Sequence, residues 1–256
     1  MSFQPSELAK PALIVFLAYF LAGRVKSIDD WRHTLLPAVI PSALLAVLIV
    51  MQPDLGTAIV CLGVTAVILY VAGMRLRYFV YSLIPIVPAL AYLLIAVPWR
   101  LQRILVFLDP DRDPRGPGFQ LTQSLIAVGT GGVTGLGLME GKQKLFYLPE
   151  PHTDFIYAVA AEELGLIGAG LVAALFFIFA WRGFRAALRA RDPFGRFLAS
   201  GITAMVVVQA FFNMSVVLAL LPTKGIPLPF ISYGGSSLFI MLASVGVLLN
   251  ITQQTE

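Results

Sequence analysis

Residues 142–168, KQKLFYLPEPHTDFIYAVAAEELGLIG, mark the point where a long polar loop ends and an apolar segment begins. Two prolines and several polar residues precede Asp154, whereas the part after it contains only two charged residues, Glu162 and Glu163. The apolar segment continues to about residue 181, which is long enough to cross a bilayer as a helix. The sequence therefore places a carboxylate at the start of a membrane-spanning helix.

The composition indicates an integral membrane protein. Of the 256 residues, 58% are hydrophobic and only 12% are charged, whereas a soluble domain has about 25% charged residues. The formal net charge of +4 is spread over loops and does not indicate a nucleic-acid partner. The single cysteine, Cys61, excludes a disulfide within the chain.

We predict seven membrane-spanning helices, since each needs about 20 mostly apolar residues. They cover residues 5–23, 34–51, 55–73, 78–98, 154–181, 197–221 and 236–251. Prolines occur inside several of them, which is tolerated in membranes where neighbouring groups satisfy the freed carbonyls. The predicted fold class is an all-α polytopic membrane protein, with residues 1–256 as a single domain.

Basic residues in the short loops predict the orientation of these helices. The loops 24–33, 74–77 and 182–196 are rich in Lys and Arg, and they alternate as cytoplasmic loops must. The long loop 99–153 is then external, together with 52–54 and 222–235. Met1 would also be external, and an external start without a signal sequence predicts further helices before it.

The external loop 99–153 is too long for a simple connector, and we expect it to be ordered. Residues 99–108 and 119–128 have apolar faces and predict short amphipathic helices at the membrane surface. Cations of this loop could hold phosphate groups, or could bind lipid head groups without specificity. They are Arg100, Arg103, Lys142 and Lys144.

The carboxylates at the start of the 154–181 segment have two interpretations each. Asp154 at a helix N-terminus suits a general base or a cation ligand, because the helix dipole favours its charged form. Alternatively, Thr153 or Asp154 only caps the helix. Glu162 shares a helical face with Asp154 and either lines a polar cleft or forms a structural ion pair, while Glu163 points away and could pair with a neighbouring helix.

Charged residues nearer the start of the chain are also candidates. Glu7 and Lys10 are one helical turn apart and either pair locally or face a cavity. Asp54 is a possible partner of Lys10 or a turn residue after Pro53. Residues 222–237, PTKGIPLPFISYGGSS, predict either a re-entrant or tightly folded loop, or an ordinary external connector.

The motifs of several soluble enzyme classes are absent from the sequence. It has no P-loop, no G-x-G-x-x-G, no H-E-x-x-H and no G-x-S-x-G pattern. ATP hydrolysis, NAD chemistry and zinc proteolysis are therefore not indicated.

Four stretches resemble the SEDS family, named for shape, elongation, division and sporulation. They are FQPSELAK at 3–10, QPDLGTA at 52–58, the opening stretch at 142–168, and LLPTKGIPLPFISYGGSSL at 220–238. The first and last are more similar to the division branch (FtsW) than to the elongation branch (RodA). The resemblance implies a ten-helix fold, of which this chain supplies the last seven helices.

The same resemblance implies a peptidoglycan glycosyltransferase of the bacterial cytoplasmic membrane, with its active site on the extracytoplasmic face. Such an enzyme polymerises lipid II and releases undecaprenyl pyrophosphate. Asp154 matches the essential aspartate of the family, which would deprotonate the acceptor 4-hydroxyl or hold a divalent cation, Mg²⁺ or Mn²⁺. The oxygen would then attack C1 of the donor sugar with inversion, without a covalent intermediate.

The resemblance also implies how other residues contribute. The cations Arg103, Lys142 and Lys144 would stabilise the pyrophosphate, and Glu7, Lys10 and Asp54 match positions that line a central cavity. The candidate substrate-binding residues are Arg103, Lys142, Lys144, His152, Glu7, Lys10, Asp54 and Glu162.

The implied partners are lipid II, membrane lipids, a penicillin-binding transpeptidase, and divisome or elongasome proteins. Two alternative functions are a lipid II flippase and a scaffold that recruits the transpeptidase. A flippase needs charges near the membrane midplane, whereas most of the unusual residues here belong to the external side.

Overall fold

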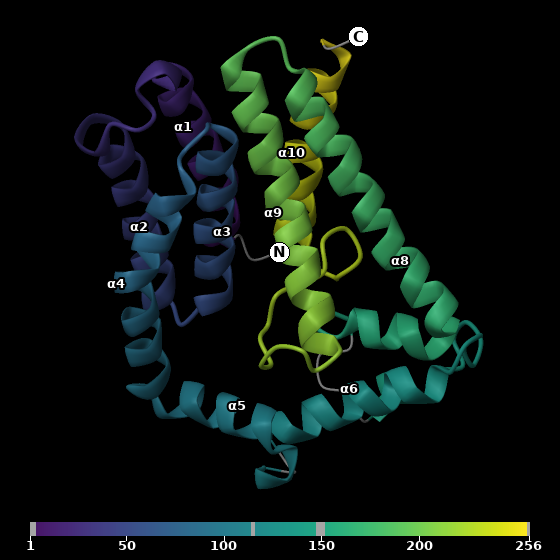
Figure 1. Ribbon diagram of the computed structural model, residues 1–256. Helices are drawn as coiled ribbons and strands as arrows, with labels where there is room; N and C mark the ends of the chain where they lie inside the picture. The colour runs from purple at the N-terminus through teal and green to yellow at the C-terminus, as the bar shows by residue number, and fades with distance from the viewer. Residues whose placement is uncertain (1–3, 114–115, 147–151, 255–256) are drawn as a thin grey trace. The chain divides into compact units, whose positions relative to one another are not determined.

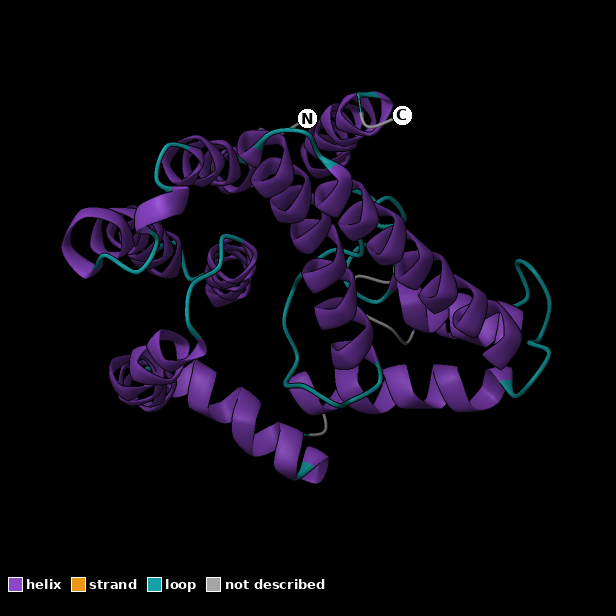
Figure 2. Cartoon of the chain, turned by 45° about the horizontal axis from the view of Figure 1, so that its top comes forward, coloured by secondary structure: helices purple, strands orange, loops and turns teal. Residues whose placement is uncertain are grey.

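A computed structural model describes residues 4–113, 116–146 and 152–254 (Figure 1), and within these ranges its regular elements are all helices (Figure 2). This confirms the predicted all-α class. The α-helices are α1 (Pro5–Ala22), α2 (Leu36–Met51), α3 (Leu55–Val71), α4 (Leu76–Ile95), α5 (Pro98–Leu108), α6 (Pro117–Gly131), α7 (Gln143–Phe146), α8 (Ile156–Arg189), α9 (Pro193–Val217) and α10 (Gly235–Gln253). Shorter helical turns are η1 (Val25–Ser27), η2 (Trp31–Leu35) and η3 (Pro110–Arg112).

Six helices of the described chain are long and apolar enough to cross a membrane. They are α1, the continuous helix of η2 and α2, α4, α8, α9 and α10. The predicted third span corresponds to α3, which is apolar but has only 17 residues. The chain is therefore an integral membrane protein by the length and composition of its helices, and the seven-span count stays a prediction.

The chain divides into two compact units. Unit 1 comprises residues 1–79, 176–209 and 234–256, and unit 2 comprises residues 80–175 and 210–233. The single domain predicted from the sequence stays a prediction, and each unit is described by itself.

Unit 1 is a bundle in which α1 packs against α2, α3 and α10. Its core includes Leu17, Leu21 and Met205, all fully buried. Gly201 on α9 has no room for a side chain, because a Cβ atom would lie 2.5 Å from Ile14 and 2.8 Å from Ile68. A glycine at this position therefore lets α9 approach α1 and α3 closely.

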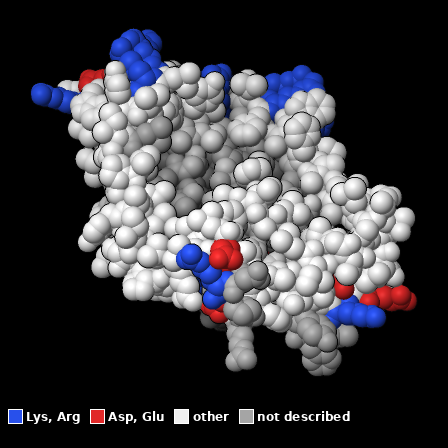
Figure 3. Space-filling view, turned by 60° about the horizontal axis from the view of Figure 1, so that its bottom comes forward, with Lys and Arg blue, Asp and Glu red and all other residues white. Residues whose placement is uncertain are grey.

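The basic loops of unit 1 lie at one end of the bundle. Arg75 Nε lies 2.6 Å from Asp29 Oδ2, so the loops 24–33 and 74–77 are adjacent. The turn between α8 and α9 is at the same end of this unit in Figure 1, and basic side chains stand out along that edge in Figure 3. The three loops therefore share one side of unit 1, and the cytoplasmic location of that side stays a prediction.

Unit 2 contains the helices of the long loop. The predicted segments 99–108 and 119–128 are confirmed as helices, α5 and α6, which run across the direction of α4 (Figure 1). Two residues of α5 face inward: Arg100 is 6% exposed and donates to the Leu93 carbonyl, and Val106 is 2% exposed. The loop is therefore built of ordered helices in its described part.

The helix α8 is broken at Gly165, although the sequence predicted one continuous segment over 154–181. Gly165 has φ 66° and ψ −167°, a conformation that residues with a Cβ atom avoid. The first part of α8 therefore ends at Leu164, and the helix continues in a new direction after the break, as Figure 1 shows.

The backbone groups freed by the break form hydrogen bonds with residues 132–137, which we call the glycine turn. In an unbroken helix, Leu166 and Ile167 would donate to the carbonyls of Glu162 and Glu163. All four groups bond to the glycine turn instead. The bonds are Leu136 N to Glu162 O (3.1 Å), Gly137 N to Glu163 O (3.0 Å), Leu166 N to Gly132 O (2.9 Å) and Ile167 N to Val133 O (3.2 Å).

Candidate active site

The residues just before α8 are held by their backbone. Each carbonyl oxygen of residues 152–154, which we call the junction, accepts one hydrogen bond from a residue between 213 and 233. The bonds are Tyr233 N to His152 O (2.9 Å), Ser232 Oγ to Thr153 O (2.5 Å) and Asn213 Nδ2 to Asp154 O (2.8 Å). The position of the Asp154 backbone is therefore set by α9 and by the loop that follows it.

Residues 218–234, the α9–α10 loop, pack directly on the Asp154 side chain. A Cβ atom on Gly225 would lie only 2.8 Å from Asp154 Oδ2, so Gly225 packs directly against the Asp154 carboxylate. Ile226 and Leu228 are 3% and 1% exposed, and Leu228 N donates to Ser232 Oγ at 2.7 Å. Of the two sequence interpretations, the tightly folded loop is therefore correct.

Arg103 on α5 brings a positive charge to the same region. Its Nη1 donates to the Thr223 carbonyl of the α9–α10 loop at 3.2 Å, and its guanidinium lies 5.2 Å from the centre of the Trp99 ring. Burial lowers the pKa of Arg103, and the negative charge of Asp154 acts in the opposite direction. Arg103 and Asp154 are thus electrostatically coupled within unit 2.

The two glutamates of α8 hold the segment Met139–Lys144. Glu162 is 1% exposed, and its Oε1 accepts from Lys142 N at 2.9 Å and from Gln143 N at 3.3 Å. Glu163 accepts from Met139 N at 3.1 Å and from Lys144 Nζ at 2.5 Å. Glu163 thus pairs with Lys144 of the short helix α7.

These contacts bear on the predicted cations of the loop. The ammonium group of Lys144 is already paired with Glu163, so it would have to share its charge with a substrate phosphate. The side chain of Lys142 is exposed, and its backbone is fixed by Glu162. His152 is exposed at the junction. Their roles in substrate binding stay predictions.

The three other predicted residues belong to unit 1. Lys10 Nζ donates to Glu7 Oε1 at 2.7 Å and to Gln209 Oε1 at 3.0 Å, and both Glu7 and Lys10 are 4% exposed. Asp54 caps α3 by accepting from Thr57 N at 3.0 Å. The structure therefore supports local pairing for Glu7 and Lys10 and a capping role for Asp54.

Sequence reasoning missed the polar residues of α9 and the α9–α10 loop. Asn213 and Gln209 are four residues apart in an apolar segment, and this is a signal of buried polar contacts that could have drawn attention. Ser232 and Gly225 carry no comparable signal, because their importance depends on distances to residues far away in the sequence.

A divalent cation at Asp154 would need ligands from the substrate. Within the described residues, no group of three or more His, Cys, Asp or Glu side chains could hold a metal ion. Mg²⁺ is commonly held by one or two carboxylates together with substrate phosphates. Asp154 fits the protein part of such a site.

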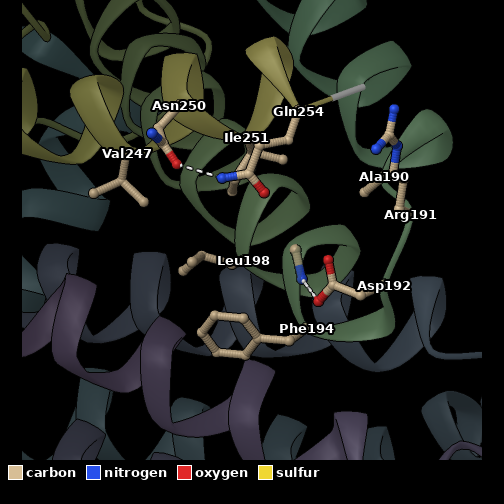
Figure 4. A pocket seen from close by; sticks show the side chains of 10 residues that line it. Ala190, Arg191, Asp192, Phe194, Leu198, Val247, Asn250, Ile251 and Gln254 are labelled. Atoms are coloured by element: carbon tan, nitrogen blue, oxygen red, sulfur yellow. Dashed lines mark hydrogen bonds between the residues drawn. The ribbon is translucent and has the colours of Figure 1, made fainter. Parts of the chain in front are cut away.

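A pocket of about 220 Å³ lies away from these residues, in unit 1. It opens between the start of α9 and the end of α10 (Figure 4). Its walls are formed by Phe194, Leu198 and Val247, with Asn250 and Gln254 hydrogen-bonded at 2.8 Å on one side. It contains none of the predicted site residues.

The chain is similar to known proteins over its whole length. A family model described as cell cycle protein (FtsW, RodA, SpoVE) matches residues 1–256. A Geobacter metallireducens protein named probable peptidoglycan glycosyltransferase FtsW is 49% identical over 253 residues, which cover 99% of this chain and 68% of the relative. Stage V sporulation protein E of Bacillus subtilis is 48% identical over 257 residues, covering 100% of this chain and 70% of the relative.

Solved structures show the same fold. One describes the structural coordination of polymerization and crosslinking by a peptidoglycan synthase complex. A chain of that complex has a TM-score of 0.78 and 31% identity, covering 100% of this chain and 71% of that chain. The rod shape determining protein RodA of Thermus thermophilus has a TM-score of 0.65 and 30% identity, covering 100% of this chain and 67% of that one.

Proposed function

Because the chain belongs to the FtsW, RodA and SpoVE family of cell cycle proteins, we propose that it is a peptidoglycan glycosyltransferase that polymerises lipid II. The observation that carries this proposal is the junction. A carboxylate on a backbone held at three consecutive carbonyls interacts electrostatically with a half-buried arginine, Arg103. A fixed base next to a fixed cation suits the transfer of a sugar from a phosphate leaving group.

Asp154 acts as the general base in this mechanism. Its carboxylate takes the proton from the 4-hydroxyl of the acceptor sugar, and the oxygen attacks C1 of the donor sugar as the bond to the pyrophosphate breaks. A single displacement inverts the configuration at C1. A general base of this kind contributes about 10²–10⁴-fold to the rate.

The leaving group is undecaprenyl pyrophosphate, whose negative charge grows as the bond to C1 breaks. Arg103 stabilises this charge, supported by Lys142 and, after sharing with Glu163, by Lys144. A divalent cation bound at Asp154 would supply further neutralisation of the pyrophosphate. His152, Glu162, Glu7, Lys10 and Asp54 remain proposed contacts of the large lipid-linked substrate.

The membrane setting follows from the same proposal. The polyprenyl tail stays in the bilayer of the bacterial cytoplasmic membrane, while the sugar reacts on the extracytoplasmic face. A penicillin-binding transpeptidase and other divisome or elongasome proteins are the proposed partners. The similar structure of a peptidoglycan synthase complex supports such a partner.

The test compares Asp154→Asn with Asp192→Asn in the full-length protein, supplied with labelled lipid II and a transpeptidase partner. Asp192 is a matched control, because it too stands just before a long helix, α9, where its carboxylate accepts from Gly195 N at 2.9 Å. We expect glycan polymer from the wild type and from Asp192→Asn, and about 10²–10⁴-fold less from Asp154→Asn. Thermal melting checks that both variants fold.

Equal polymerisation by Asp154→Asn would refute the proposed role of this carboxylate. Absence of polymer from every protein, together with movement of lipid II across vesicle membranes, would favour the flippase. Absence of both activities, with the transpeptidase still bound, would favour the scaffold.

A further inference from the structure

Asn213 is a buried polar residue near the end of α9, with 2% of its surface exposed. Its side-chain amide donates two hydrogen bonds, one to Asp154 O at 2.8 Å and one to Ile226 O at 2.7 Å. Both N–H groups of one amide therefore connect the junction to the α9–α10 loop.

This connection sets the distance between the junction and the loop at the point where they meet. Gly225 precedes Ile226 in the chain, and its Cα region already contacts the Asp154 carboxylate. The same loop is held at Thr223 by Arg103. The segment 223–226 is thus fixed by Arg103 at one end and by Asn213 at the other.

The amide oxygen of Asn213 supports a specific role for its donors. Asn213 Oδ1 is buried and makes no hydrogen bond within the described residues. A buried acceptor without a partner lowers stability. The unpaired oxygen of Asn213 therefore lowers stability, while both of its N–H groups form hydrogen bonds. A residue that served packing alone would not be expected to carry this cost.

We propose that Asn213 is the positioning residue of Asp154. It holds the backbone of the general base at a fixed distance from the loop that binds Arg103, and so aligns the base with the cation that receives the leaving group. This inference rests on the proposed glycosyltransferase function and identifies a residue that acts through Asp154 without touching the substrate.

The test uses Asn213→Leu in the full-length protein, because leucine has nearly the same shape and donates no hydrogen bond. Misplacing a catalytic group by about 1 Å can reduce a rate by about 10²-fold. We therefore expect kcat for lipid II polymerisation to fall about 10²-fold, with KM changed by no more than about threefold.

Ser124→Ala is the matched control. Ser124 is fully buried in the same unit and donates one side-chain hydrogen bond, from Oγ to Val217 O at 2.8 Å, so its partner is not a residue of the junction. This variant should melt at a lower temperature than the wild type yet keep its kcat. Asn213→Ser is the second test variant. Serine is small and polar, so this variant should fold more readily than Asn213→Leu, but serine cannot reach both carbonyls. It should therefore show the same fall in kcat.

The outcomes separate this inference from the proposed function. If Asp154→Asn is inactive while both Asn213 variants keep the kcat of Ser124→Ala, Asn213 is not a positioning residue and the function stands. If KM rises and kcat is unchanged, Asn213 contributes to binding and the inference is overturned. If Asp154→Asn polymerises normally, the proposed function itself fails.

Discussion

Two buried polar clusters, one in each unit, are stabilised in different ways. In unit 1, the Lys10 ammonium group donates to Glu7 and Gln209, so the hydrogen bonds join side chains to one another. In unit 2, the hydrogen bonds at Asp154 that define its position run to its backbone carbonyl and to those of its two neighbours. The position of Asp154 is thus set through the backbone, whereas Glu7 and Lys10 are held through their side chains.

The largest expected effect on stability comes from breaking the cluster of unit 1. Lys10→Met leaves the Glu7 carboxylate, which is 4% exposed, without its cation. We expect a loss of about 3–5 kcal/mol in the free energy of unfolding, because a buried charge is left uncompensated. Reversible unfolding in bicelles measures it.

The double variant Glu7→Gln with Lys10→Met is the control for this prediction. It removes both charges and should recover most of the lost stability. A double variant as unstable as Lys10→Met would show that packing, and not charge pairing, accounts for the loss.

The next effect is on activity and comes from unit 2. Gly225→Ala places a Cβ atom within 2.8 Å of Asp154 Oδ2 and pushes the carboxylate away from its position. We expect polymerisation to fall about 10²-fold, equivalent to about 2.7 kcal/mol in the barrier, with little change in melting temperature.

Gly234→Ala provides the comparison for Gly225→Ala. A Cβ atom at Gly234 meets nothing closer than 3.6 Å, so this variant should keep its activity. Activity of Gly225→Ala within threefold of the wild type would mean that the loop yields and that the junction is less rigid than its bonds indicate.

A smaller effect is expected at the carboxylate that binds the segment before the junction. Glu162→Gln removes the negative charge that accepts from Lys142 N and Gln143 N. We expect this segment to lose about 1–2 kcal/mol of local stability, seen as faster hydrogen exchange of a peptide over residues 139–144. Glu140→Gln, whose side chain is exposed, should leave the exchange unchanged, and equal protection in Glu162→Gln would contradict the prediction.

The smallest effect is expected for an exposed ion pair. Arg75 and Asp29 are 2.6 Å apart, but their side chains are 58% and 34% exposed. Arg75→Gln should therefore lower the free energy of unfolding by less than about 1 kcal/mol, and salt should reduce the difference further. A larger loss that does not depend on salt would mean that this pair behaves like the buried pair of Lys10 and Glu7.

The sequence predicted the helices well, because length and hydropathy are local properties. Six predicted spans correspond to helices long enough to cross a membrane, and α5 and α6 lie where amphipathic patterns indicated. The break at Gly165 escaped prediction, since a glycine in an apolar segment also allows close helix packing. The break depends on the glycine turn, which lies against α8 and bonds to the freed backbone groups. No local sequence pattern reveals that contact.

Asp154 could be selected from the sequence, but its surroundings could not. Its place at the start of an apolar segment and the family resemblance both pointed to it. The donors on Asn213 and Ser232 belong to residues 59 and 79 positions away from the carbonyls they bind. Such contacts depend on how the helices pack, so the sequence predicted the reactive group and not the residues that position it.

The break in α8 also has a consequence for how the protein assembles. Lipid offers no hydrogen bonds to the four backbone groups that the break releases, so they must find partners within the protein. Their partners all come from the glycine turn, which belongs to the long loop and is made before α8 during synthesis. The bent form of α8 therefore has to wait until the glycine turn has folded against it, which couples folding of the loop to completion of the helix.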